Sequence, residues 1–144
     1  MFDTSVFSPY RKRIDKFIPV SKFSLVVFYE LAATNIDDSA IQKLEMWKNT
    51  LNKVNGLVTP TQTDWLMAAK AVRRLRKMSL IDKNLLAAVL QNDALIARSS
   101  FMHKCFVVTD NIRDYALLQK VMSKLEVIPA KDFSVKQVRQ RKEV

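Results

Sequence analysis

Several acidic residues stand in apolar stretches, where an ionised carboxylate is costly to bury without a partner. Asp3 lies in the N-terminal stretch MFDTSVF, and Glu30 lies in the apolar stretch LVVFYELAA. Asp93 falls on the apolar stripe of a helix predicted around QNDALIA. A fourth acidic stretch, TDNIRDY, carries Asp110 and Asp114 directly after the apolar stretch CFVV. Their positions raise the question of what these carboxylates bind.

If these four regions converge, their carboxylates repel one another, and their pKa values rise unless a cation neutralises them. Ligand sets made only of oxygen suit Mg²⁺ or Mn²⁺ rather than zinc. Such an ion can hold a phosphate, help to deprotonate an attacking water and stabilise the leaving oxygen. The pattern therefore indicates metal-dependent hydrolysis of a phosphodiester.

Each acid also has a purely structural explanation. Asp3 could cap a turn after its strand, Glu30 could pair with an arginine, and Asp93 could mark a helix break. Asn111 followed three residues later by Asp114 resembles a helix capping box, and acids suit a helix N-terminus in any case.

The charge of the chain favours an anionic partner. There are 24 Lys and Arg residues against 14 Asp and Glu residues, a net charge of +10, and nucleic acid is the leading candidate. Ordinary surface charge that keeps the protein soluble explains the excess equally well. The basic residues that could hold RNA follow the first strand or crowd one helix: Arg11, Lys12, Arg13, Arg73, Arg74, Arg76 and Lys77. For the helix cluster, a solvated face near the helix C-terminus is an equal alternative.

The length of 144 residues predicts one domain with a sizeable core. No stretch is apolar for long enough to span a membrane, no lipidation signal is present, and the N-terminus does not resemble a signal peptide. The single cysteine, Cys105, cannot form an internal disulfide, which fits a cytoplasmic location. His103 has the features of a helix-end residue, and Trp47 and Trp65 those of core or dimer-contact residues.

Short apolar strands alternate with helical segments along the chain. Strands are predicted at 1–7, 17–21, 57–60, 105–109 and 125–130, and helices at 37–54, 61–77, 84–103 and 111–122, with Gly56 as a helix stop and Thr61 and Asp64 as a capping box. This order predicts an α/β domain with a mainly parallel sheet, whose working residues collect beyond the carboxyl ends of the strands. We expect that domain to cover residues 1–130, followed by a basic tail, 131–144, that is partly frayed.

Four stretches, in order, resemble the motifs of the PIN-domain metal-dependent ribonucleases, in particular the VapC-type toxins of toxin–antitoxin pairs. MFDTSVF is similar to the N-terminal Asp-Thr/Asn-Ser strand of that family, and SLVVFYELAA to its segment ending in Glu-Leu. NDALIARSS is similar to its Asn-Asp-x-x-Ile-Ala helix, and FVVTDNIRDYALL to its closing motif after a strand. Each motif alone is weak, but the four together span nearly the whole chain.

The resemblance implies a three-layer α/β/α sandwich of Rossmann-like type with a central, mainly parallel sheet. It also implies an endoribonuclease with a Mg²⁺ or Mn²⁺ site, a homodimer and, for a toxin, an antitoxin that covers the active site. Carried over residue by residue, the acidic positions are Asp3, Glu30, Asp93 and Asp114, with Asp110 and Asn111 in reserve. Asn111 stands where the family often has Asp, and Tyr115 where it usually has Phe. Thr4, Ser5 and Thr109 are expected to hydrogen-bond the carboxylates and fix their rotamers.

The residues leave other functions open. A PIN-type nuclease could act in RNA processing instead of as a toxin, and the departure at Asn111 keeps a non-catalytic, basic RNA-binding module in play. A phosphoacceptor receiver domain also clusters acids around Mg²⁺, but it needs paired acids after its first strand, where this chain has only Asp3.

Overall fold

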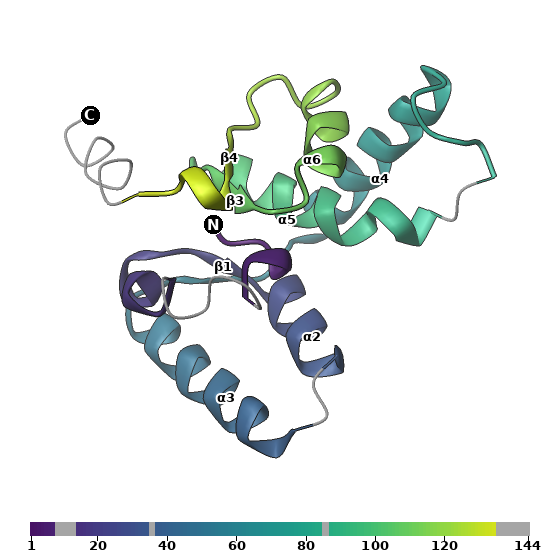
Figure 1. The fold of residues 1–144 in the computed structure, drawn as a ribbon. Coiled ribbons are helices and arrows are strands. Elements are labelled where there is room, and N and C mark those ends of the chain that lie inside the picture. Colours follow the sequence, from purple (N-terminus) through teal and green to yellow (C-terminus); the bar gives the residue numbers. More distant parts are fainter. Residues whose placement is uncertain (8–13, 35–36, 85–86, 135–144) are drawn as a thin grey trace.

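The protein is a mixed α/β domain in which helices surround a few short parallel strands (Figure 1). The computed structural model describes residues 1–7, 14–34, 37–84 and 87–134. The α-helices are α2 (Leu25–Thr34), α3 (Asp38–Lys53), α4 (Gln62–Lys77), α5 (Gln91–Met102) and α6 (Ile112–Gln119). The strands are β1 (Phe23–Ser24), β2 (Leu57–Val58), β3 (Val107–Thr109) and β4 (Val127–Pro129). Short 3₁₀ turns occur at η1 (Thr4–Val6), η2 (Asp15–Val20), η3 (Ala87–Leu90) and η4 (Ala130–Asp132).

All strand pairs in the described residues are parallel, as predicted. They form two separate pairs, β1 with β2 and β3 with β4, instead of one continuous sheet. The N-terminal segment joins the second pair through a parallel bridge between Phe2 and Val108. The backbone N–H of Asp3 donates to the Val108 carbonyl at 2.9 Å, so the first acid stands directly beside β3.

Two predicted strands are wrong. Beyond Phe2, the segment predicted as a strand turns into η1, with the Val6 N–H donating to the Asp3 carbonyl at 3.3 Å. The segment 17–21 lies in η2, where Phe17 and Ile18 are consecutive and both buried, which the alternating faces of a half-exposed strand do not allow. The long helix predicted over 84–103 is also divided, because η3 ends at Leu90 before α5 begins.

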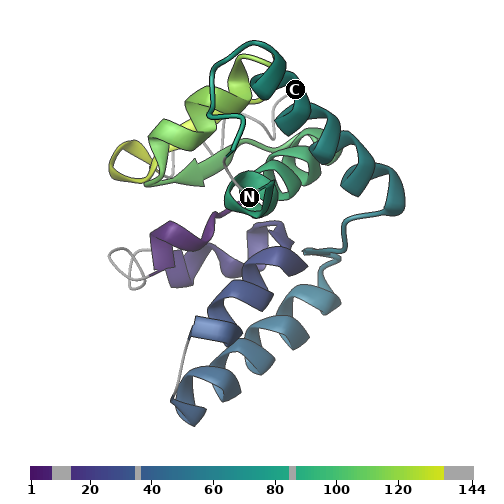
Figure 2. The same ribbon diagram turned by 90° about the vertical axis from the view of Figure 1, so that its right-hand side faces the viewer.

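The α2 and α3 helices lie side by side and extend away from the part built by β3, β4, α5 and α6 (Figures 1 and 2). Helix α3 ends in a turn that places Asn55 in the left-handed region at φ 49°. Gly56 was predicted as the helix stop, but its φ is not positive. A Cβ atom there would lie 2.8 Å from the Ser21 carbonyl oxygen, so close backbone approach explains this glycine.

The core extends to Phe133, three residues beyond the boundary expected at residue 130. Its ring packs against Phe2 and Phe17 with centroids 5.3 and 5.0 Å apart. The tail from residue 135 onwards lies outside the described residues. Within the described residues, no helix combines the length and hydropathy that a membrane span requires.

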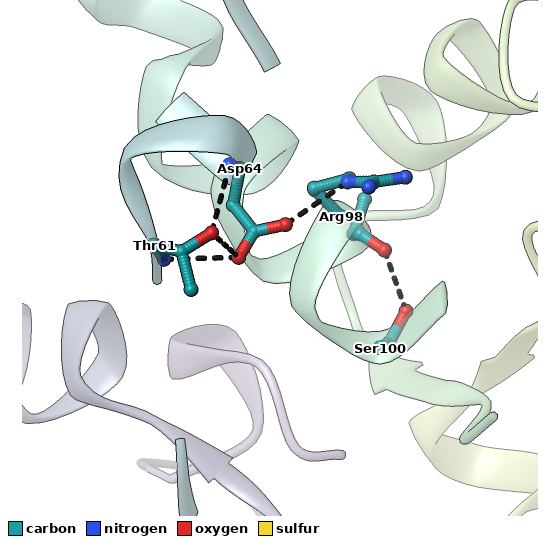
Figure 3. A network of polar contacts seen from close by, with 5 residues as sticks. Thr61, Asp64, Arg98 and Ser100 are labelled. Atoms are coloured by element: carbon teal, nitrogen blue, oxygen red, sulfur yellow. Dashed lines mark hydrogen bonds and ion pairs between the residues drawn. The ribbon is translucent and has the colours of Figure 1, made fainter. Parts of the chain in front are cut away.

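Helix α4 is joined to α5 by a polar clamp (Figure 3). The predicted capping box is confirmed, since Thr61 caps α4 and the Asp64 side chain accepts from the Thr61 backbone at 2.9 Å. The second Asp64 oxygen accepts from the Arg98 guanidinium of α5 at 3.0 Å. Burial raises the pKa of Asp64, but the hydrogen bonds from Thr61 and Arg98 outweigh it and leave the pKa lowered.

Replacing Asp64 by Asn should lower the free energy of unfolding by about 2 kcal/mol, because it removes the negative charge of a partly buried ion pair and weakens a helix cap. Since the folded-state pKa of Asp64 is lowered, the stabilisation is present at neutral pH and lost as the pH falls through the folded-state pKa. Urea unfolding at pH 7 and pH 3 measures both effects. An equal loss at the two pH values would contradict this role.

Candidate active site

The four predicted carboxylates come together from four separate segments. Asp3 precedes η1, Glu30 lies within α2, and Asp93 and Asp114 lie in the first turns of α5 and α6. All four line one open cleft of about 280 Å³. The rest of the lining is Thr4, Ser5, Ala88, Val89, Asn92 and Asn111.

Asp3 is held by hydroxyl groups and is only 3% exposed. Its Oδ2 accepts from Ser5 Oγ and from Thr109 Oγ1, both at 2.7 Å. Its Oδ1 accepts from the Tyr115 hydroxyl at 3.3 Å. Burial, and then the charges of Asp3 and Asp93, raise the pKa of Tyr115 well above its usual range. The phenol therefore stays protonated and continues to donate.

Glu30 is held at both of its carboxylate oxygens. Thr4 Oγ1 donates to Oε2, and Asn92 Nδ2 donates to Oε1 at 2.9 Å. Thr4 lies in η1 and Asn92 in the first turn of α5, so Glu30 connects α2 to both neighbouring elements. These two donors orient the carboxylate towards the cleft that they also line.

Asp93 and Asp114 share one donor, the side-chain amide of Asn111. Asn111 Nδ2 lies 3.2 Å from Asp93 Oδ2 and 3.0 Å from Asp114 Oδ2. Asn111 stands at the N-cap of α6, but its side chain makes no capping hydrogen bond to the helix. The capping-box explanation for Asn111 and Asp114 is therefore wrong.

The cleft raises the pKa of Asp93 from 3.8 to about 7. Burial is the largest cause, followed by the negative charges of Asp3, Asp114 and Glu30. Negative charge from the three other carboxylates of the cleft therefore acts on Asp93 and disfavours its ionised form.

This donor set suits Mg²⁺ or Mn²⁺ in chemistry, since it offers carboxylate oxygens and an excess of negative charge. The described residues nevertheless contain no group of three or more His, Cys, Asp or Glu side chains already arranged to hold a metal ion. Hydroxyl and amide donors take up the carboxylate oxygens instead. A cation bound here would have to replace some of these hydrogen bonds.

Other predicted site residues lie away from the cleft. Asp110 is exposed, and it contributes its backbone N–H to Ser5 Oγ at 2.9 Å. In the α4 cluster, Arg73, Arg74 and Lys77 are exposed and Arg76 is half-buried, and none of them lines the acidic cleft.

Arg74 instead lines a second cavity of about 400 Å³, together with Lys70, Arg98 and Lys124. The basic residues Arg11, Lys12 and Arg13 lie outside the described residues. His103 is exposed at the end of α5, Trp47 packs on Phe7, and Trp65 is 48% exposed.

Three residues of the site escaped the sequence analysis in these roles. Asn92 was noted only as a member of the stretch NDALIARSS, yet its side chain donates to Glu30. Tyr115 was noted only as a departure from Phe, although a hydroxyl at a buried aromatic position signals a polar partner. Val89 lines the cleft while 54% exposed, and nothing in its sequence context indicates that position.

Comparisons with known proteins bear on the fold. No family model matches the sequence, and no curated protein matches it. A chain in the structure of VapBC-1 from nontypeable Haemophilus influenzae matches with a TM-score of 0.61 and 18% sequence identity, over 91% of this chain and 97% of that chain. The likeness shows that this chain has the α/β fold of that structural neighbour, which is the PIN-like fold expected from the motifs.

Proposed function

We propose that this protein is a Mg²⁺- or Mn²⁺-dependent endoribonuclease and the toxin of a toxin–antitoxin pair. The observation that carries the proposal is the convergence of Asp3, Glu30, Asp93 and Asp114 on one open cleft. Their coupling, which raises the pKa of Asp93 to about 7, is the electrostatic condition that a divalent cation relieves. The fold shared with the VapBC-1 chain supports the class.

In this proposal the four carboxylates hold the cation, which supplies Lewis-acid stabilisation of charge on the phosphodiester. Three hydroxyl groups donate to the two oxygens of Asp3 and fix its orientation. Glu30 is fixed by Thr4 and Asn92. Rigid placement keeps the reorganisation needed during catalysis small.

The net charge of +10 supports RNA as the substrate, because Lys and Arg side chains neutralise phosphates along the strand. The exposed cations of α4 are candidates for such contacts. They lie outside the cleft, so they would hold RNA at a distance from the cleaved bond.

The test is an RNA cleavage assay with the purified protein in Mn²⁺, in Mg²⁺ and in EDTA. We expect cleavage with either cation and none in EDTA. Asp110→Asn is the matched control for an acidic-site variant, because it removes one carboxylate next to α6 but outside the cleft, and it should cleave at the wild-type rate. RNA that is bound but never cut under any of these conditions would favour a non-catalytic RNA-binding module.

The toxin and partner parts of the proposal have a separate test. Exposed Val89 at the edge of an acidic cleft fits a partner protein that covers the site with apolar and basic side chains. Expression of the chain in a bacterial host should arrest growth, and co-expression of a small neighbouring gene should restore it. Normal growth with an active nuclease would favour a role in RNA processing. Light scattering of the purified protein tests the proposed homodimer.

A further inference from the structure

The side-chain amide of Asn111 lies between two carboxylates of the cleft. One nitrogen atom, Nδ2, donates to Asp93 and Asp114 at 3.2 and 3.0 Å, so the two accepting oxygens lie within about 6 Å of each other. At that separation the two like charges repel each other. The partly positive amide hydrogens offset this repulsion without a bound ion.

The backbone of Asn111 ties the same residue to the Asp3 cluster. Its N–H donates to Thr109 Oγ1 at 2.9 Å, and Thr109 Oγ1 donates to Asp3 Oδ2 at 2.7 Å. Asn111 is therefore connected, directly or through one hydroxyl, to three of the four carboxylates. An Asn at an N-cap ordinarily accepts from the helix backbone, but this side chain is directed at the two carboxylates instead.

We propose that Asn111 is a positioning residue that holds Asp93 and Asp114 together in the cation-free protein and competes with the divalent cation for their oxygens. The inference rests on the proposed function only in naming the competitor as a divalent cation. It follows that the acidic site is assembled before the cation arrives. It also follows that at least one hydrogen bond from the Asn111 amide to a carboxylate breaks when the cation binds.

The test compares Asn111→Ala with wild type and with Asn49→Ala, whose position is exposed on α3. The first measurement is urea unfolding at pH 8 in EDTA and at saturating Mn²⁺. Asn111→Ala should unfold at lower urea in EDTA than either reference protein, and Mn²⁺ should remove most of that difference. The second is Mn²⁺ affinity, followed by the electron paramagnetic resonance signal of the free ion. The Mn²⁺ affinity should rise about tenfold in Asn111→Ala. The reason is that the Asn111 amide stabilises only the cation-free state and so opposes cation binding.

Weaker Mn²⁺ binding by Asn111→Ala would overturn the inference and assign Asn111 as a cation ligand through its carbonyl oxygen. If Asn111→Ala unfolds at the same urea concentration as wild type in EDTA, the inference is also overturned, because the amide then contributes nothing to the stability of the carboxylate pair. If wild type and variant both fail to bind Mn²⁺, the proposed function fails and competition fails with it. Unfolding in EDTA still decides whether Asn111 holds the two carboxylates.

Discussion

Replacing Asp93 by Asn is expected to lower the rate of RNA cleavage by about 10³-fold or more, because a lost carboxylate ligand removes several kcal/mol of charge stabilisation at the transition state. The same substitution should make the cation-free protein more stable at pH 8. The cleft raises the pKa of Asp93 from 3.8 to about 7, so ionised Asp93 opposes folding at that pH. With one pKa unit worth about 1.4 kcal/mol and some solvent screening at this half-buried group, the gain is about 2 kcal/mol.

The sign of the pH dependence follows from proton binding. Between about pH 4 and pH 7 the folded protein keeps a proton on Asp93 that the unfolded chain has lost, so stability falls as the pH rises through this range. An uncharged Asn has no such dependence. The stability advantage of Asp93→Asn should therefore be small at pH 5 and largest at pH 8.

Urea unfolding in EDTA at pH 5 and pH 8, together with the cleavage assay, measures both parts of this prediction. Asp110→Asn serves again as control, since Asp110 is exposed and lies outside the cleft. If Asp93→Asn cleaves RNA normally, Asp93 has no role in the reaction. If it is less stable than wild type at pH 8, its carboxylate serves a structural purpose instead.

The second large effect is the coupling of cation binding to a proton on Asp93. Cation binding requires the ionised carboxylate, so it should release about 0.8 proton at pH 6.5 and about 0.1 at pH 8. Below pH 7 the Mn²⁺ affinity should fall by about tenfold per pH unit through this group alone. Titration calorimetry in two buffers that differ in ionisation enthalpy counts the released protons. Equal heats in both buffers at pH 6.5 would mean that cation binding releases no proton. That result would contradict a coupling between cation binding and the ionisation of Asp93.

The sequence was informative about the acidic site because a carboxylate in an apolar stretch conflicts with its surroundings. Asp3, Glu30 and Asp93 stand out for that reason, and the structure brings all three into one cleft. TDNIRDY left a choice between acids that pattern alone could not make. The start of α6 places Asp114 in the cleft and leaves Asp110 exposed.

Local geometry set the limit of what the sequence could predict about the fold. A strand and a 3₁₀ turn can share the same apolar residues, and Phe17 and Ile18 are buried through tertiary packing rather than through alternation. The break before α5 lies at Leu90, which carries no glycine or proline signal. The sequence pattern also does not predict contacts between distant residues, such as the hydrogen bond from Tyr115 to Asp3, which lie 112 positions apart.

The central claim is that four carboxylates act as one cation site. Its most direct test is Mn²⁺ binding, followed by electron paramagnetic resonance at pH 7.5, for wild type and for neutral variants at single positions. We predict that wild type binds Mn²⁺, that Asp110→Asn binds it equally well, and that each of four variants loses at least about tenfold in affinity: Asp3→Asn, Glu30→Gln, Asp93→Asn and Asp114→Asn. A wild-type protein that binds no Mn²⁺, or affinity that survives all four substitutions, would contradict the account.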